Sequence, residues 1–594
     1  MKKTLFISLL LVAGLTFAQD PAAPAPDAGT AQPAVEQPAT PAVEQPAAPA
    51  PETPATPPAD KPTDTDKKAD EAKADDTKSA TEGGKEKVSW SVGMGSVTVD
   101  GKQWNRLSLR PDIPIWKFGL CLDIEIFVDD SGNISDKGWK FNNAKNIFES
   151  ISRKIYYLRF GHPGDKVYAK IGALDNVTLG YGLIMSGYAN SLQYPDVKKM
   201  GLHFELNNIG TYGVGVQGVI NNFQDFQRDG ALIGTRLSVQ PLLSTGIPIL
   251  KNLAVGGSYV TDLNQRAAIT DRDGDKVPDV LDKQPNDKNW AIDHPEFTLL
   301  DTTAPAIAGA VHIVDSAYQV INDSTVSKYR SYIEGKDPFS IAGADIGLPL
   351  INKKWLNLLV YGQWAMDVDS KDKYDSIKTT GWGIAAPGAR FGLGPVVLTA
   401  EYRYFKDQFQ GQYFDQTYEL DRMKQIDSAT LWAKERFLEK YANSTMSGVF
   451  SGIQMNLINI LAAQATYQWM KVTYDKVDSL VEQPGTDQSI SASVGLGETV
   501  RNVLRKVKID DVNAYYLKKN IGTWVVDYTT EPVFDKFLEK TPFVLMGYKV
   551  GFQLSQSMIL YWDTQYTYVL DETTDNQYDL KIKKRLNIET VMRF

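Results

Sequence analysis

Apolar and polar residues alternate along much of the chain from Val88 onward. The last nine residues, 586–594, are an example, because every second side chain of an extended strand lies on the same face. One face carries Leu586, Ile588, Thr590, Met592 and Phe594, and the other carries Asn587, Glu589, Val591 and Arg593. A period of two predicts β-strands with an apolar face and a mostly polar face.

The same pattern recurs in segments of about ten residues. Clear examples are 88–95, 118–126, 398–404, 461–469 and 560–568. Their second faces include Asp123, Glu401 and Arg403. Charged side chains are costly in a dry core, whereas a water-filled interior accommodates them. Segments of this length also match what a tilted strand needs to cross a bilayer.

Strict alternation that stops at a terminal aromatic residue, Phe594, resembles the closing strand of bacterial outer-membrane β-barrels. The resemblance implies an all-β fold, a large antiparallel transmembrane β-barrel over residues 88–594. The number of alternating segments predicts about 16–20 strands, with 18 as the working value. Three longer excursions, at about 262–338, 406–444 and 498–541, are expected to be loops.

Residues 1–18 read as a secretory signal peptide. Lys2 and Lys3 precede an apolar stretch at 5–15, and Thr16-Phe17-Ala18 supplies small residues before the expected cleavage site. No later segment approaches the ~18 consecutive apolar residues of a transmembrane helix. We therefore expect export to the outer membrane of a Gram-negative-type bacterium, with membrane lipid as a partner.

Residues 19–87 have a different composition, rich in Ala and Pro and then in Lys and Asp. The octapeptide PAVEQPAT at 33–40 is followed by PAVEQPAA at 41–48. Neither half has enough apolar residues to offset the entropy of folding, so we expect a disordered periplasmic linker. Two interpretations stay open: a tether that reaches toward the cell wall, and an inert spacer.

Composition is consistent with a barrel. The 594 residues include 28 Tyr, 12 Trp and 46 Gly, yet hydrophobic residues make up only 43%. Mean hydropathy is −0.28, as expected where lipid-facing residues alternate with polar ones. A soluble secreted β-protein could share this composition. The net charge of −9 gives no reason to expect nucleic-acid binding.

One acidic motif in the first excursion, D-R-D-G-D-K-V-P-D-V-L-D at 271–282, suggests metal binding. Ca²⁺ takes six to eight oxygen ligands, which clustered short carboxylates supply. The motif resembles one thrombospondin type-3 calcium repeat. That resemblance implies a structural Ca²⁺ held by Asp271, Asp273, Asp275, Val277 through its carbonyl, Asp279 and Asp282. The alternative is an acidic, solvated loop.

The second and third excursions contain two further features. Residues 428–441 contain good helix formers and predict a loop helix that caps or plugs the barrel. The third excursion carries a basic cluster, which would either steer anions to the mouth or be simply solvated. It consists of Arg501, Arg505, Lys506, Lys508, Lys518 and Lys519.

Histidine and cysteine are scarce. His203 is expected in the lumen with Glu205, and Cys121 on the same face as Asp123. The other histidines are His162, His294 and His312. They form no arrangement typical of a catalytic site, so an enzyme is not expected.

The sequence favours a porin-like channel for small hydrophilic solutes, because a barrel of this size encloses room for water. The alternative is a surface-display or adhesive outer-membrane protein with a calcium-stiffened loop. A plugged lumen would favour display, and an open lumen would favour transport.

Overall fold

The computed structural model describes residues 88–593, apart from gaps at 100–101, 137, 196, 272–273, 275, 283–326, 369–379, 428–429, 458, 476–482, 528–532 and 571–579. The predicted signal peptide and linker, residues 1–87, lie outside the described residues, and so does Phe594. Within the described residues, no helix has the length and apolar character that a membrane crossing requires.

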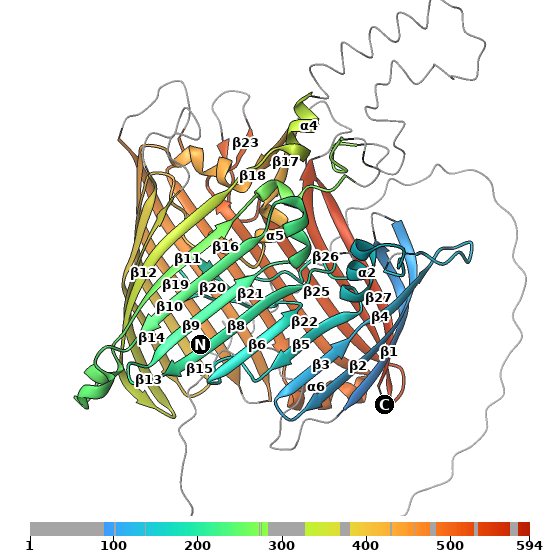
Figure 1. The fold of residues 1–594 in the computed structure, drawn as a ribbon, viewed down its shortest axis with the longest axis horizontal. Helices are drawn as coiled ribbons and strands as arrows, with labels where there is room; N and C mark the ends of the chain where they lie inside the picture. Colours follow the sequence, from blue (N-terminus) through green and yellow to red (C-terminus); the bar gives the residue numbers. More distant parts are fainter. Residues whose placement is uncertain are drawn as a thin grey trace, which may run out of the picture. The chain divides into compact units, whose positions relative to one another are not determined.

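A single antiparallel sheet closes into a barrel (Figure 1), because its first strand, β1, pairs with its last strand, β27. The wall strands are β1 (Ser89–Val99), β2 (Lys102–Ile115), β3 (Phe118–Leu122), β4 (Ile124–Val128), β5 (Ile155–Phe160), β6 (Val167–Gly172), β8 (Gly201–Ile209), β9 (Val214–Ile220), β10 (Leu232–Val239), β11 (Ala254–Asp262), β12 (Phe339–Lys353), β13 (Leu356–Asp367), β14 (Trp382–Leu393), β15 (Val396–Lys406), β19 (Ser444–Leu457), β20 (Leu461–Tyr474), β21 (Thr486–Leu496), β22 (Ile509–Ile521), β25 (Val544–Gln553), β26 (Met558–Leu570) and β27 (Leu580–Arg593). Closure leaves the sheet without a free first or last strand, which an open sheet would expose in a bilayer.

Strands β3 and β4 are two parts of one strand. Both pair with β2, and the register continues from Asp112↔Cys121 to Leu109↔Ile124 without a shift. The sheet of 21 assigned strands is therefore a barrel of 20. This number confirms the predicted range of 16–20, at its upper limit rather than at the working value of 18.

The alternation read from the sequence separates the outside of the barrel from the inside. On β15, Tyr402 is 47% exposed on the outer face, whereas its neighbours Glu401 and Arg403 are buried inside. Trp90 on β1 and Trp469 on β20 are likewise exposed on the outer face. The barrel thus presents apolar and aromatic side chains outward and charged ones inward, as membrane-spanning barrels do.

The two ends of the barrel differ. The long connections include 129–154, 173–200, 263–338, 407–443 and 522–543. They leave the end opposite to the one at which β27 finishes (Figure 1). The other end carries short turns such as 116–117, 354–355 and 394–395. A closed, even-numbered barrel with this asymmetry has the fold of an outer-membrane β-barrel.

The connections contain the remaining elements. The α-helices are α2 (Ala144–Ser152), α4 (Ser327–Glu334), α5 (Tyr418–Asp421) and α6 (Glu498–Leu504). The 3₁₀ turns are η1 (Phe223–Arg228), η2 (Leu243–Thr245), η3 (Leu250–Asn252), η4 (Gln265–Ala268), η6 (Lys434–Tyr441) and η7 (Arg505–Val507). The short strand pairs are β7 (Met185–Ser186) with β16 (Phe414–Asp415), β17 (Met423–Asp427) with β18 (Thr430–Ala433), and β23 (Val525–Asp527) with β24 (Val533–Phe534).

Two sequence predictions are wrong in these connections. The third excursion, 498–541, is not one loop, because β22 crosses the barrel wall in its middle. The helix expected over 428–441 is replaced, where the structure describes it, by strand β18 and the 3₁₀ turn η6. Hairpin pairing with β17 and burial of Leu438 and Tyr441 outweigh the local helix propensity.

Candidate functional site: the occupied lumen

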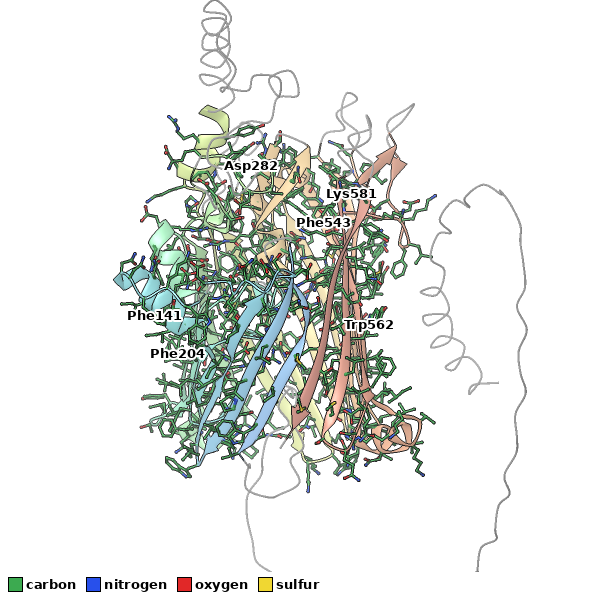
Figure 2. The ribbon with its side chains drawn as sticks, turned by 90° about the vertical axis from the view of Figure 1, so that its right-hand side faces the viewer. Phe141, Phe204, Asp282, Phe543, Trp562 and Lys581 are labelled. Atoms are coloured by element: carbon green, nitrogen blue, oxygen red, sulfur yellow. The ribbon has the colours of Figure 1, made fainter. Side chains whose placement is uncertain are left out.

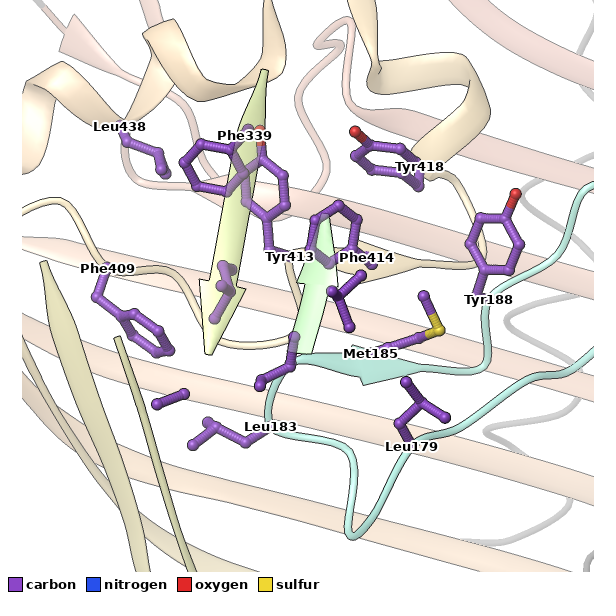
Figure 3. Close-up of a cluster of buried hydrophobic side chains, with 14 of the residues drawn as sticks. Leu179, Leu183, Met185, Tyr188, Phe339, Phe409, Tyr413, Phe414, Tyr418 and Leu438 are labelled. Carbon is purple, nitrogen blue, oxygen red and sulfur yellow. The ribbon is translucent and has the colours of Figure 1, made fainter. Parts of the chain in front are cut away.

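Two connections turn back into the barrel and occupy part of its interior. We call residues 173–200, between β6 and β8, and 407–443, between β15 and β19, the plug segments. They meet in a parallel pairing of β7 with β16, in which Met185 lies opposite Phe414. Figure 3 shows the buried cluster that surrounds this pairing.

Aromatic side chains hold the second plug segment against the wall. Phe409, Tyr413, Phe414 and Tyr418 are at most 1% exposed. They pack with inward-facing side chains of the wall strands, which include Val219, Leu232, Val260, Phe339, Ile341, Phe405, Met446 and Met470. Burial of this much aromatic surface stabilises the inward position of the segment.

Glycines in the wall make room for this packing. A Cβ built on Gly383 of β14 would lie 2.4 Å from the ring of Phe409. A Cβ on Gly347 of β12 would collide with the hydroxyl of Tyr181, whose ring stacks on Tyr361 at 4.5 Å. The close approach of the plug segments therefore depends on missing side chains in the wall.

A buried ionic cluster anchors the plug segments at the loop end. Arg422 is fully buried and donates to both carboxylate oxygens of Asp262, at 2.6 and 2.7 Å. It also donates to Asp225 at 2.7 Å, and the hydroxyl of Tyr418 donates to Asp262 at 2.7 Å. Bidentate pairs of this kind set the relative orientation of the two side chains and also pair their charges.

Glu419 joins the two plug segments in the same cluster. It accepts hydrogen bonds from Lys199 and from the hydroxyl of Tyr188, both of the first segment. Burial alone would raise the pKa of Glu419, but Lys199 and Arg422 outweigh it and lower the pKa to about 2. The carboxylate is therefore charged at neutral pH and binds the segments together.

A second ionic cluster ties the first plug segment to the strands at the closure. Arg106 on β2 pairs with Asp123 at 2.9 Å and with Glu589 of β27 at 3.0 Å. Tyr194 accepts from Arg106 at 2.7 Å, and Lys198 pairs with Asp123 at 2.7 Å. Because Glu589 belongs to the last strand, this cluster also links the two ends of the sheet.

The wall formed by β21, β22, β25, β26 and β27 differs from the wall that packs against the aromatic plug residues, because two of its rows are mostly polar. One register row crosses it: Ser493, Tyr515, Gly547, Gln565 and Arg585. The adjoining row is Gly495, Asn513, Lys549, Asp563 and Asn587. Apart from Gly547, all members of both rows keep partial solvent exposure. We call these two rows the polar wall.

Polar contacts join the plug segments to the far side of the barrel. Gln416 donates to Ser491 at 3.1 Å, and Lys519 pairs with Asp415 at 2.7 Å. Arg585 of the polar wall donates to the backbone carbonyls of Leu192 and Gln193. A small cavity of about 40 Å³ lies beside these contacts, lined by Gln412, Asp415, Lys434, Gln468, Asp487 and Lys519 among others. The lumen is thus narrowed from one wall to the other.

The predicted calcium residues are only partly described. Asp273 and Asp275 lie outside the described residues. Asp271 accepts from the backbone N–H of Gly274 at 2.8 Å and of Lys276 at 3.2 Å. This bonding makes a tight turn at Gly274, whose φ is +78°.

The rest of the motif packs on neighbouring loops. Val277 is buried with Ile269, Tyr329, Tyr332 and Leu431. The backbone N–H groups of Asp279 and Asp282 donate to Thr270 and Pro278 carbonyls at 2.8 and 3.0 Å. Asp282 lies at the loop end of the barrel (Figure 2).

Of the remaining predicted residues, those that the structure describes lie in the lumen or at its ends. His203 and Glu205 face inward and approach to 3.4 Å, and Cys121 is buried on the inner face. His162 is exposed at a turn, and His294 and His312 lie outside the described residues.

The basic cluster is split between the two ends of the barrel, and four of its six members form ion pairs. Arg501 and Arg505, at the short-turn end, pair with Asp511 and Asp510, both at the start of β22. Lys518 pairs with Asp535 at 2.9 Å, and Lys519 with Asp415. The described contacts therefore do not support a basic patch at the mouth.

The first plug segment was not predicted from the sequence. Residues 173–200 interrupt the alternation between two strands, and that interruption was the available signal. The long-range partners of Tyr188, Tyr194 and Lys199 have no sequence signature, because they come from connections and strands far apart in the chain.

Comparison with known proteins finds no family model and no curated protein that matches this chain. Similar solved structures include Wzi of Escherichia coli, described as a carbohydrate-binding outer-membrane β-barrel involved in group 1 capsule assembly, at 9% identity, 86% coverage of this chain, 84% of that chain and a TM-score of 0.28. OccK11 of Pseudomonas aeruginosa has 5% identity, coverage of 85% and 95%, and a TM-score of 0.29. FpvA of the same organism has 12% identity, coverage of 85% and 72%, and a TM-score of 0.34. Similarity this low carries no argument about the role of the chain.

Proposed function

We propose that the chain is a constricted outer-membrane channel for small hydrophilic solutes, which pass between the plug segments and the polar wall. The polar wall is the observation that supports this proposal. Elsewhere the plug segments bury aromatic and aliphatic side chains against the barrel, whereas here hydroxyl, amide and charged side chains stay partly exposed. A hydrated strip of this kind suits passage of solutes that keep hydrogen bonds to the wall.

Single-channel conductance of the full chain in a planar bilayer tests the proposal. Ser493→Trp places a bulky side chain on the polar wall and is expected to lower the conductance. Ala492→Trp is the matched control, because Ala492 is adjacent but pairs with Ala465 on the lipid-facing side. Replacement of residues 408–442 by a short Gly/Ser turn is expected to raise the conductance.

A surface-display protein is the second candidate, and the wall-to-wall contacts of the plug segments favour it. In that case the barrel is a closed support for the loops. Neither the native chain nor the Ser493→Trp variant would then conduct, and only the shortened-plug variant would open a pore. That pattern would replace the channel proposal with display.

The acidic loop at 271–282 is proposed to hold a structural Ca²⁺ ion. The turn around Gly274 supports it, because Asp271 accepts two backbone N–H groups there and is held in a fixed position within the acidic sequence. Asp271, Asp279, Asp282 and the Val277 carbonyl would act together with Asp273 and Asp275.

We also propose that residues 19–87 are a periplasmic linker toward the cell wall.

A further inference from the structure

The α2 helix exposes an apolar face, which a helix of a water-soluble protein would bury. Ile147, Phe148 and Ile151 lie within one helical arc and are 38%, 40% and 51% exposed. Ser150, next to this arc, is buried and donates to the Lys140 carbonyl at 2.8 Å. A helix in water buries its apolar stripe, so these side chains require an apolar environment that the protein itself does not provide.

Contacts on both sides of α2 place the helix at the side of the barrel. Just beyond the helix, the Lys154 carbonyl accepts from Asp123 of the β3–β4 strand at 2.8 Å. Ser152 accepts from Gln224, between β9 and β10, at 3.1 Å. The helix and its flanks therefore bridge the loop ends of β5, β6 and β8. Figure 2 shows Phe141, just before α2, outside the strands at the side of the barrel.

The strands below α2 are short. β5 and β6 have 6 residues each, whereas β26 and β27 have 13 and 14. A tilted strand needs about 9–11 residues to cross the hydrocarbon layer. The apolar belt is therefore incomplete in this sector, above outward residues such as Leu158, which is 42% exposed.

The residues before α2 fit the membrane interface. Trp139 is 39% and Phe141 52% exposed, and the Trp139 indole donates to the Glu125 carbonyl at 2.9 Å. The Lys154 ammonium lies 4.0 Å from the Trp139 ring and 5.4 Å from the Phe141 ring. Aromatic rings beside a lysine are typical of the boundary between hydrocarbon and headgroups.

We propose that α2 is a lipid-contacting element that completes the apolar belt of the barrel above β5 and β6. The apolar face of α2 contacts the acyl chains of the outer leaflet. The exposed face of α2 is continuous with the lipid-facing surface of strands that are too short to span the layer alone. Lipid contact at α2 is independent of whether the lumen conducts.

Spin labelling in lipid vesicles tests this proposal. Single cysteines replace Ile151, Phe148, Glu149 or Leu158 in a Cys121→Ser background, and retained heat-modifiability shows that each variant folds. The Ile151 and Phe148 labels should resemble the Leu158 label, accessible to oxygen and several-fold less accessible to a water-soluble nickel chelate than the Glu149 label. Glu149 is exposed on the same helix but outside the apolar arc.

Two outcomes would overturn the proposal. If the Ile151 and Phe148 labels reach the nickel chelate as readily as the Glu149 label does, α2 stands in water. If both labels are protected from oxygen and from the chelate, a protein surface, either another loop or a second copy, covers the helix instead of lipid.

Discussion

At the scale of single residues, the lumen depends on charges that are paired inside the barrel. Arg422 shows the principle, since its guanidinium is fully buried yet has a carboxylate for each of its donating nitrogens. Removing one partner of such a pair is costly, because the other charge stays buried without compensation. The plug segments should therefore be sensitive to single substitutions in this cluster.

Arg422→Met tests this sensitivity. We expect a loss of about 3–5 kcal/mol of stability in the plug region, as for other broken buried pairs. The measurement is proteolysis of residues 407–443 in the folded barrel, together with thermal unfolding. Lys406→Met is the control, because its ion pair with Asp475 at 2.9 Å is exposed and worth about 0–1 kcal/mol. Equal effects of the two substitutions would contradict the anchoring role of Arg422.

Glu419 should make the plug sensitive to acid. Its pKa is lowered from the ordinary 4.5 to about 2 in the folded state, so its contribution is complete above pH 4.5 and is lost as pH falls toward 2. Plug proteolysis should therefore increase across this window. Glu419→Gln should be less stable at neutral pH and should lose this part of the pH dependence. Parallel pH profiles for both proteins would assign the acid response to other groups.

At the scale of elements, alternation predicts most of the barrel and little of its contents. A period of two follows from the strand pleat, so outward and inward faces such as Tyr402 and Glu401 could be assigned from sequence alone. The plug segments could not be predicted, because they are held by contacts between distant positions such as Phe409 and Gly383. The β22 strand was also missed, since Asp510, Asp511, Lys518 and Lys519 make it read as a charged loop.

Gly383→Ala tests how closely the second plug segment fits the wall. The added Cβ would lie 2.4 Å from Phe409 and 2.6 Å from Phe405, and overpacking of this kind costs about 1–3 kcal/mol. Gly257→Ala in β11 is the control, because its nearest neighbour would be 3.8 Å away. We expect faster proteolysis of 407–443 in the first variant only. An unchanged plug in Gly383→Ala would mean that Phe409 moves without cost.

The acidic loop should respond to calcium without affecting the barrel. Its aspartates repel one another, and a bound ion would remove that repulsion, so calcium should protect residues 271–282 from proteolysis. Affinity should be weak, about 10⁻⁴–10⁻³ M, as in extracellular calcium modules. Asp273→Asn with Asp275→Asn should abolish the protection, whereas Asp129→Asn in another loop should not. Equal cleavage with calcium and with chelator would leave only an acidic loop.

At the scale of the whole molecule, the described residues account for a closed structure by themselves. β1 and β27 pair from Ser91↔Arg593 to Ser96↔Ile588, and Arg106 joins the strands near this closure through Glu589. The sheet therefore closes without any residue before β1. Barrel stability should then be independent of the Pro- and Lys-rich stretch that precedes it in the sequence.

Deletion of residues 20–87, with the predicted signal peptide retained, tests this independence. The truncated protein should reach the outer-membrane fraction and show the same shift in gel mobility on heating as the full chain, because no pairing of the closed sheet is lost. Protease added from the periplasmic side should cut the full chain first within 20–87 and leave the truncated chain intact. If the truncated protein failed to assemble, these residues would have to contribute to folding or closure, and the assignment of a separate linker would be wrong.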